Sequence, residues 1–381
     1  MNPLPRPAIR PVRLEAFVFR CPVKTPVQTS FGTMRDRPAL FVRLEDDEGA
    51  FGWGEVWCNF PACGAEHRAR LLETVMAPLL AGRRFDGPQE AFAWLTERTA
   101  VLALQSGEPG PIAQAVAGID IALWDLCARR AGLPLWQLLG GQADGIAVYA
   151  SGLNPDRPQD LAALRRAEGH RAFKLKIGFG ARRDLDNLAA LRELLGPDAA
   201  LMADANQSWT LEQACEIAPQ LEAFDLGWLE EPLRADRPWS EWQTLSQACA
   251  IPLAAGENLL GTESFERALS GSPLSVLQPD IAKWGGISAC WPLVGRALES
   301  GLRYCPHFLG GGIGLLASGH LLAASGGKGM LEIDANPNPL RTQLCGSLAA
   351  IDAGRARLGS LPGLGVTPDL RQLADAAARV A

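Results

Sequence analysis

The stretch AFKLK at residues 172–176 is the first of several short apolar runs that end in an ionisable residue. Similar runs follow as ALMAD (200–204), LGWLE (226–230) and PLAAGE (252–257), separated by longer amphipathic stretches. This alternation is typical of repeated βα units. Eight expected strands lie near residues 147–150, 172–176, 200–204, 226–230, 252–257, 275–278, 302–305 and 329–333. Eight such units in about 200 residues predict an α/β protein with a (β/α)8-type barrel.

The residues before the barrel have a different pattern. Strand-like segments are expected near residues 12–19, 39–44 and 51–56, with a turn at 46–49. Helical periodicity follows from about residue 65 to residue 131. A sheet followed by helices favours a separate α+β domain. We therefore expect an N-terminal α+β capping domain at 1–141, the barrel at 142–354, and a tail at 355–381 that returns to the capping domain.

The composition is that of an ordinary globular protein, with 48% hydrophobic and 20% charged residues among 381. A formal charge of −6, without a basic cluster, favours neither nucleic acid nor an anionic membrane as a partner. No apolar run approaches the roughly 20 residues of a membrane span, and the start lacks a signal-peptide core, so we expect a cytoplasmic protein. The nine cysteines form no CxxC pair and are expected to be free thiols, with Cys305 a small buried residue.

Chemistry in such a barrel lies at the carboxyl ends of the strands, and nearly every expected strand ends there in an ionisable residue. The set is Lys176, Asp204, Glu230, Glu257, Asp280, His307 and Glu332, and Asp334 competes with Glu332 on the last strand. Their spacing of 23 to 28 residues follows the strands, which surface charges would not be expected to do.

Three acids, Asp204, Glu230 and Glu257, end consecutive strands, which lie about 4.8 Å apart in a sheet. At roughly 5 Å and an effective dielectric near 20, each ionised pair repels by about 3 kcal/mol. A bound cation removes this repulsion, and ligands that are all oxygen favour Mg²⁺ over zinc. Solvated loop acids or salt-bridge partners are the alternative. Strand alternation points Glu231 to the other face, so Glu230 is the expected ligand.

Two bases are expected beside the acids. Lys174 and Lys176 are two residues apart, so both face the same way on a strand, and each ammonium is expected to lower the proton affinity of the other. His307 ends one strand and Asp280 the previous one, and an Asp beside a His fixes its tautomer and supports its protonated form. Exposed lysines and a structural histidine are the alternatives. GGGIG at 310–314 lacks a phosphate-loop lysine and is expected to give the chain freedom to turn near the dyad.

The ordered motifs now resemble those of a known family, the mandelate racemase and muconate lactonizing group of the enolase superfamily. They are KxK (174–176), DAN (204–206), EEP (230–232), GEN (256–258), PDxxKxGG (279–286) and PH (306–307). Four further motifs resemble the capping domain and tail of that group: FGWGE (51–55), DIALWDL (120–126), LLGG (138–141) and PGLGV (362–366). Asp280, where muconate-type members carry a second catalytic lysine, points to the mandelate racemase branch.

The resemblance implies a Mg²⁺-dependent enzyme in which Lys176 and His307 face each other across a carboxylate substrate. By the same resemblance Glu332 lies near the substrate carboxylate, and Lys174, Asn206 and Thr29 are expected to contact the substrate. Dehydration of an acid sugar to a 2-keto-3-deoxy acid through an enediolate is the favoured reaction. Racemisation, epimerisation and lactone cycloisomerisation are the alternatives, and a non-catalytic acid-binding barrel is an alternative of another class.

The resemblance also bears on specificity and assembly. The loops near 25–35 and 57–64 are expected to reach over the barrel mouth and to set specificity. Thr29, Ser30 and Arg35 are available there to bind a polyol, and ordinary loop polarity is the alternative explanation for them. A homo-oligomer is expected.

Overall fold

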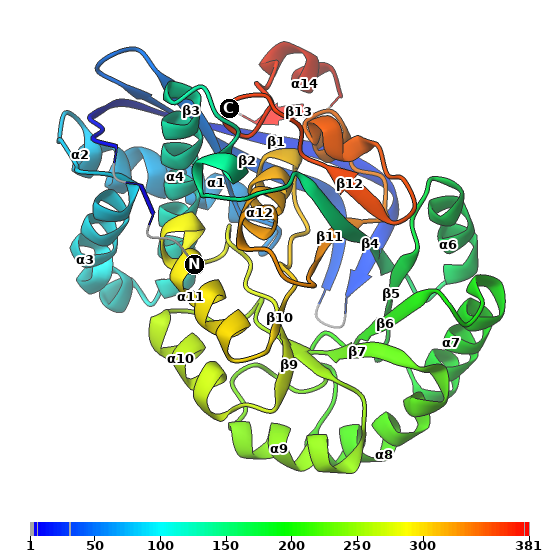
Figure 1. Cartoon of the computed structure of the whole chain (residues 1–381). Helices are drawn as coiled ribbons and strands as arrows, with labels where there is room; N and C mark the ends of the chain where they lie inside the picture. Colours follow the sequence, from blue (N-terminus) through cyan, green and yellow to red (C-terminus); the bar gives the residue numbers. More distant parts are fainter. Residues whose placement is uncertain (1–3, 6, 30–31, 377, 381) are drawn as a thin grey trace.

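The computed structural model describes residues 4–5, 7–29, 32–376 and 378–380, without the side chains of 24, 25, 27–29, 375, 376 and 378–380. Its strands form two sheets. One is antiparallel with the order β13-β1-β2-β3, and the other is a mainly parallel sheet that curls into a nearly closed barrel (Figure 1). The predicted fold class, a (β/α)8-type barrel with an N-terminal α+β cap, is confirmed.

The strands of the cap are longer than predicted. They are β1 (Pro11–Thr29), β2 (Gly32–Asp46) and β3 (Phe51–Val56). Pro22 and Pro26 interrupt the alternation that identifies a strand from sequence, and the pairing of β1 with β2 shifts register between Pro22 and Val27. Part of the stretch expected as a loop near 25–35 is therefore a hairpin arm, whereas Ser30 lies outside the described residues.

The helices of the cap pack on this sheet through α4. They are α1 (Gly64–Leu71), η1 (Leu72–Met76), α2 (Ala77–Leu80), α3 (Pro88–Ser106), α4 (Pro109–Arg130) and α5 (Leu135–Leu138). A Cβ on Gly52 would lie 2.1 Å from Ala122 O, and one on Gly54 would lie 2.0 Å from Gly118 O. The glycines of FGWGE are thus required for β3 to contact α4 closely.

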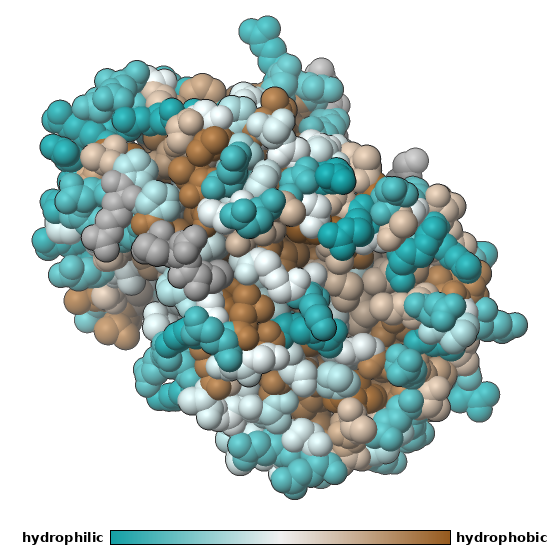
Figure 2. Space-filling model, in the orientation of Figure 1, coloured by the Kyte–Doolittle hydropathy of each residue, from teal (hydrophilic) through white to brown (hydrophobic). Residues whose placement is uncertain are grey.

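Helix α4 also corrects an expectation about apolar runs. It is long and apolar enough to cross a membrane, and 89% of its apolar window is buried inside the protein. A helix that is hydrophobic on all sides is typical of a core helix, which is how α4 packs here. In the orientation of Figure 1, hydrophilic side chains cover much of the outer surface and hydrophobic atoms are visible toward its middle (Figure 2).

The barrel consists of eight parallel strands, each followed by a helix. The strands are β4 (Gly145–Leu153), β5 (Ala172–Lys176), β6 (Ala200–Asp204), β7 (Leu226–Glu230), β8 (Leu253–Ala255), β9 (Leu274–Leu277), β10 (Arg303–Tyr304) and β11 (Met330–Asp334). The helices are α6 (Pro158–Ala167), α7 (Ala181–Leu195), α8 (Leu211–Leu221), α9 (Trp239–Ala248), α10 (Thr262–Gly271), α11 (Gly286–Glu299), α12 (Gly312–Ser325) and α13 (Pro339–Thr342). Pairing runs from β10 through β4 to β11, and Met330 N donates to Cys305 Sγ (3.4 Å) across the remaining gap.

One apolar layer fills the inside of the barrel. Its members are Tyr149, Ala172, Met202, Trp228, Ala254, Val276, Cys305 and Met330, which come from every strand or from the residue that follows it. Cys305 is accordingly a small buried core residue, as expected. Because side chains alternate along a strand, the next inward positions toward the carboxyl ends belong to Lys174, Asp204, Glu230 and Glu332. The apolar layer is therefore the floor of the candidate site.

The end of the chain contacts both parts of the molecule. β12 (Arg355–Arg357) pairs with β4 of the barrel. Gly363 bridges to Pro134, and β13 (Ala378–Val380), after α14 (Leu370–Ala376), pairs with β1 of the cap.

Buried carboxylates of the cap hold the barrel by accepting hydrogen bonds from its backbone. Glu55 accepts from Gly311 N and from Gly314 N (2.8 Å) at the start of α12. Asp120 accepts from Ile287 N (2.7 Å) and Ser288 N (2.9 Å) at the start of α11. Free N–H groups at a helix N-terminus favour such acceptors. The two helices that follow the Asp280 and His307 strands are therefore fixed to the cap.

The glycines of GGGIG are explained by this contact. Gly311 has a φ of −80°, and the positive-φ glycines of the described chain lie elsewhere. A Cβ on Gly311 would lie 2.8 Å from Glu55, one on Gly312 would lie 2.4 Å from the Leu344 backbone, and one on Gly314 would lie 2.3 Å from the Phe308 ring. The expectation of conformational freedom was wrong, because close packing is what excludes side chains here.

Candidate active site

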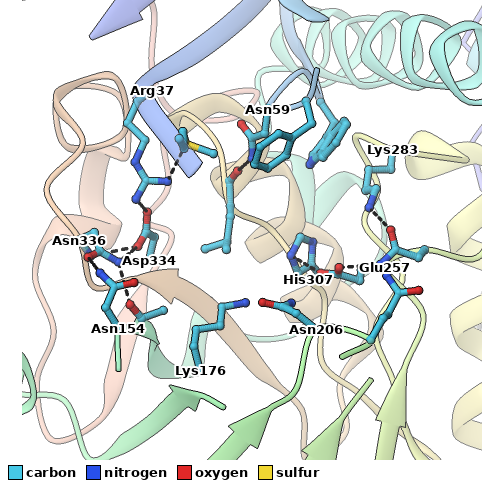
Figure 3. Close-up of a pocket in the computed structure, with 17 residues that line it drawn as sticks. Arg37, Asn59, Asn154, Lys176, Asn206, Glu257, Lys283, His307, Asp334 and Asn336 are labelled. Atoms are coloured by element: carbon cyan, nitrogen blue, oxygen red, sulfur yellow. Dashed lines mark hydrogen bonds and ion pairs between the residues drawn. The ribbon is translucent and has the colours of Figure 1, made fainter. Parts of the chain in front are cut away.

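A cavity of about 300 Å³ lies between the cap and the carboxyl ends of the barrel strands. The cap lines it with Met34, Arg37, Trp57, Asn59 and Phe60. The barrel lines it with Gly152, Asn154, Lys176, Asn206, Gln207, Glu257, Asn258, Lys283, His307, Leu309, Asp334 and Asn336. Figure 3 shows Lys176 and Asn206 between two groups of polar side chains on opposite sides of the view. A concave site with few, convergent polar groups is the usual form of a small-molecule site.

The three predicted metal ligands are all buried and each lies beside a cation. Lys176 Nζ is 2.6 Å from Asp204 Oδ2, and Lys174 Nζ is 2.5 Å from Glu230 Oε1. His307 Nε2 is 2.5 Å from Glu257 Oε2. Glu257 follows the short strand β8 rather than ending it, because Gly256, with a φ of +148°, turns the chain out of the sheet.

Glu231 does not point to the other face, as strand alternation predicted. It is buried with a φ of +39°, and Asn258 Nδ2 donates to its two carboxylate oxygens at 3.0 and 2.8 Å and to Glu257 Oε1 at 2.8 Å. Alternation does not extend past the last strand residue, Glu230, so Glu231 joins the acid cluster. Burial, then Glu257 and Asp204, raise its pKa well above the ordinary value.

The donor chemistry of this cluster fits a divalent cation. Six buried carboxylates face four cationic groups when His307 is protonated. The carboxylates belong to Asp204, Glu230, Glu231, Glu257, Asp280 and Glu332, and the cationic groups to Lys174, Lys176, Lys283 and His307. The buried carboxylates outnumber the cationic side chains, and their ligand atoms are oxygens, the preference of Mg²⁺. In the described part of the chain, no three His, Cys, Asp or Glu side chains converge on one point. Each predicted ligand lies instead against a lysine or His307.

The two lysines are buried beside carboxylates that raise the pKa of both. Burial by itself lowers the pKa of Lys174, but Glu230 and Glu332 outweigh it and raise that pKa well above the ordinary value. Burial and Lys174 lower the pKa of Lys176, yet Asp204 leaves it raised. Lys174 thus lowers the pKa of Lys176, as expected, but the nearby carboxylates outweigh this repulsion and leave the pKa of both lysines raised. The alternative of exposed edge lysines is wrong, since both are buried.

His307 and Asp280 form the predicted dyad. His307 Nδ1 is 2.8 Å from Asp280 Oδ2, and the other Asp280 oxygen accepts from Ala282 N (2.9 Å). Burial lowers the pKa of His307, but Glu257, Glu332 and Asp280 raise it well above the ordinary value. The imidazole is thus oriented by one carboxylate, and its protonated form is favoured by three.

Of the other residues predicted to contact the substrate, some line the cavity and one is buried beneath it. Glu332 is fully buried under the cavity. Its carboxylate pairs with Lys174 Nζ (2.8 Å) and accepts hydrogen bonds from Ser151 Oγ (2.5 Å) and Phe308 N (3.0 Å). Asp334, its competitor, lines the cavity wall. Asn206 lines the cavity and donates to Asp204 Oδ2 (3.2 Å). The side chain of Thr29 lies outside the described residues.

Sequence reasoning did not find Arg37, Asn154, Asn336 and Asn258 as lining residues. Arg37 comes from the cap, and no local pattern distinguishes it. One signal at the strand ends is visible only in the backbone: Asn206 and Gln207 have φ values of +44° and +64°. Non-glycine residues in this region cluster at functional sites.

A nearly closed parallel barrel with polar residues at its strand ends, under an antiparallel cap, is an enolase-like architecture. The sequence matches two models that together cover most of the chain. They are the mandelate racemase / muconate lactonizing enzyme N-terminal domain, over residues 13–140, and the enolase C-terminal domain-like model, over residues 158–373. The chain belongs to the mandelate racemase / muconate lactonizing enzyme family, so the resemblance read from the motifs is confirmed.

Several proteins are similar over nearly the whole chain. D-galactarolactone cycloisomerase of Agrobacterium fabrum is 32% identical over 358 residues, which is 90% of this chain and 92% of that protein. Arabinonate dehydratase of Saccharolobus solfataricus is 28% identical over 85% of this chain and 86% of its own. A solved mandelate racemase/muconate lactonizing enzyme from Bordetella bronchiseptica RB50 has a TM-score of 0.93 and 59% identity over 97% of this chain and 99% of its own. A racemase from Streptomyces coelicolor, solved with bound magnesium, has a TM-score of 0.85 and 28% identity over 97% of this chain and 100% of its own.

Proposed function

We propose that this chain is a Mg²⁺-dependent lyase that dehydrates an acid sugar to a 2-keto-3-deoxy acid. The observation that carries the proposal is that Lys176 and His307, the latter oriented by Asp280, line one cavity beside a cluster of buried acids. The relatives include proteins named arabinonate dehydratase and L-talarate/galactarate dehydratase, which supports the reaction class. The enzyme class, a lyase or an isomerase, is shared by the named relatives.

The reaction begins with removal of the proton from the carbon next to the substrate carboxylate. Lys176 takes this proton, and the electron pair left on the α-carbon forms the enediolate of the substrate. For Lys176 to act as the base, the pull of Asp204 on its proton must be relieved, and the nearby Lys174 ammonium then favours the neutral amine.

The second step expels the β-hydroxyl. His307 is held protonated by its carboxylate neighbours, so it donates a proton to this hydroxyl, which leaves as water. The electrons of the enediolate form the C2–C3 double bond, and the resulting enol loses the proton of its C2 hydroxyl and takes up a proton at C3 to give the 2-keto-3-deoxy acid. Asp280 keeps the imidazole in the orientation needed for donation.

Asp204, Glu230 and Glu257 are the residues proposed to hold the metal. Mg²⁺ bound there would neutralise the negative charge of these carboxylates and the negative charge that forms on the substrate carboxylate. The excess of buried carboxylates over cationic side chains in the cluster supports this assignment.

The test is incubation of the purified protein with Mg²⁺ and a library of mono- and diacid sugars, followed by an assay for 2-keto acid. Lys176→Ala and His307→Asn should each abolish the signal. Lys328→Ala and His67→Asn, the same substitutions at an exposed lysine and a half-buried histidine outside the cavity, should not.

Other products would redirect the proposal. Exchange of the α-hydrogen for solvent deuterium without keto acid would overturn dehydration in favour of racemisation or epimerisation. Opening of an acid lactone without loss of water would favour the cycloisomerase reaction for which one relative is named.

A further inference from the structure

The side of the cavity away from His307 is built from a second polar cluster. It consists of Arg37 from β2 and three residues of the barrel, Asn154, Asp334 and Asn336. In Figure 3 this cluster faces the His307 and Glu257 side, with Lys176 between them. The proposed chemistry uses none of these four side chains.

Arg37 has hydrogen-bonding capacity left over. Its side chain is only 5% exposed, Nη2 is 2.7 Å from Asp334 Oδ2, and Nη1 contacts Met34 Sδ at 3.5 Å. Within the described chain Nε has no hydrogen-bond partner. A guanidinium has five N–H donors in a planar fork that matches a carboxylate. Leaving such donors unpaired in a buried position is costly, which indicates that a ligand completes them.

The charge on this side is positive, in contrast to the His307 side. Asp334 lies between Arg37 and Arg341, whose Nη1 is 3.5 Å from Asp334 Oδ2, so two guanidiniums share one carboxylate. Asn154 adds a donor group on the same wall and donates to Asn336 Oδ1 (3.1 Å), while its own Oδ1 is buried without a partner in the described chain. An anion with adjacent hydroxyls fits this wall.

We propose that Arg37 binds the distal carboxylate of the substrate, and that the substrate class is therefore diacid sugars rather than monoacid sugars. This inference rests on the proposed function, because the proximal carboxylate has to lie at the Lys176 and His307 side. Arg37 gains its missing partner, and Asn154 and Asn336 contact the hydroxyls next to the distal carboxylate.

The experiment compares sugars that differ only at C6. Galactarate is paired with galactonate, and glucarate with gluconate, so that a carboxylate replaces a hydroxymethyl group at constant stereochemistry. The kcat/KM is measured with Mg²⁺ for wild type, Arg37→Gln and Arg37→Lys. Binding of each sugar to the His307→Asn protein, with and without Arg37→Gln, is measured by calorimetry, which does not depend on turnover.

Wild type should prefer the diacid of at least one pair. Arg37→Gln should lower the diacid-to-monoacid ratio of kcat/KM by about 10- to 100-fold, the range expected for hydrogen bonds to a charged group. Arg37→Lys should recover part of the ratio because it keeps the charge. Arg43→Gln, the same change on the same strand outside the cavity, should leave the ratio unchanged.

Three results would overturn the inference. Equal turnover of both members of each pair, with no effect of Arg37→Gln on the ratio, would leave the proposed dehydration standing without a diacid subsite. Full recovery of the ratio in Arg37→Gln/Asp334→Asn would mean that Arg37 only neutralises Asp334. If no sugar yields keto acid, the proposed function fails, and a calorimetric preference for monoacids would then refute the subsite as well.

Discussion

Replacement of Glu55 by Gln should change the thermal stability of the protein in a way that depends on pH. Glu55 is buried at the joint between cap and barrel, and burial raises its pKa from 4.5 to about 7, against the opposing effect of hydrogen bonds from Gly314 and Gly311. Below pH 4.5 the carboxyl is protonated in both the folded and the unfolded chain, so ionisation contributes nothing. Between pH 4.5 and 7 the unfolded chain loses the proton and the folded chain keeps it, so wild type loses stability as pH rises.

The size of the effect follows from the shift. A difference of about 2.5 pH units corresponds to about 3 kcal/mol at 1.36 kcal/mol per unit. With about 2.1 cal/mol/K of unfolding entropy per residue, 381 residues give about 0.8 kcal/mol/K, so this is about 4 °C in Tm. Gln does not titrate, but its amide cannot accept from both Gly311 N and Gly314 N, which costs about 1–2 kcal/mol at every pH.

The assay is scanning calorimetry of wild type and Glu55→Gln at intervals from pH 4.5 to pH 8.5. The Tm of Glu55→Gln should lie about 1–2 °C below wild type at the acid end and about 2 °C above it at the alkaline end. Glu263→Gln, at an exposed position on α10, controls for loss of a surface charge. A Tm difference that stays constant, or moves the opposite way, would show that the α12 N-terminus holds Glu55 ionised and that burial is not the dominant influence.

Three further predictions concern the dyad, the metal and the second joint. Asp280→Asn should lower kcat by about 10²- to 10⁴-fold with a small change in KM, because His307 loses the carboxylate that orients it. Steady-state kinetics test this, and an unchanged kcat would remove Asp280 from the mechanism. Removal of Mg²⁺ with a chelator should abolish turnover, and turnover in the chelated protein would contradict the proposed cofactor. Mg²⁺ at 100 times its Kd should stabilise the protein by about 2.7 kcal/mol, which calorimetry would show as a rise in Tm. Asp120→Ala should destabilise the protein by about 2–5 kcal/mol, since the N–H groups of Ile287 and Ser288 lose their buried acceptor, and a Tm within 1 °C of wild type would contradict this.

The barrel was predictable because its evidence is local in the sequence. Each strand is a short apolar run, and its last inward side chain follows from alternation, which places Lys174, Lys176, Asp204 and Glu230 on one face. The same rule failed one residue later, at Glu231, because its positive φ takes it out of the strand geometry. The alternation of side chains therefore predicts which way a residue faces inside a strand better than it does for the residues that follow the strand.

The remainder of the site depends on contacts between distant parts of the chain. Arg37 lies on the cap and Asp334 at the end of the last barrel strand, and no spacing rule links them. The direction of the lysine pKa shifts likewise depends on which carboxylates lie nearest, and this is set by the closure of the barrel. The metal ligands, the substrate contacts and the homo-oligomer stay predictions.

The contacts between cap and barrel suggest why the chemistry and the specificity of this site can change separately. The cap is fixed to the loops that carry the dyad: Trp57 N donates to Ala282 O (3.3 Å) after Asp280, and Asn59 Nδ2 donates to Leu309 O (2.5 Å) after His307. Movement of the cap would therefore move the dyad. Arg37 lies on β2 and contacts the barrel on the opposite side of the cavity, at Asp334, so its replacement would alter the distal wall while the hydrogen bonds at the dyad loops remain.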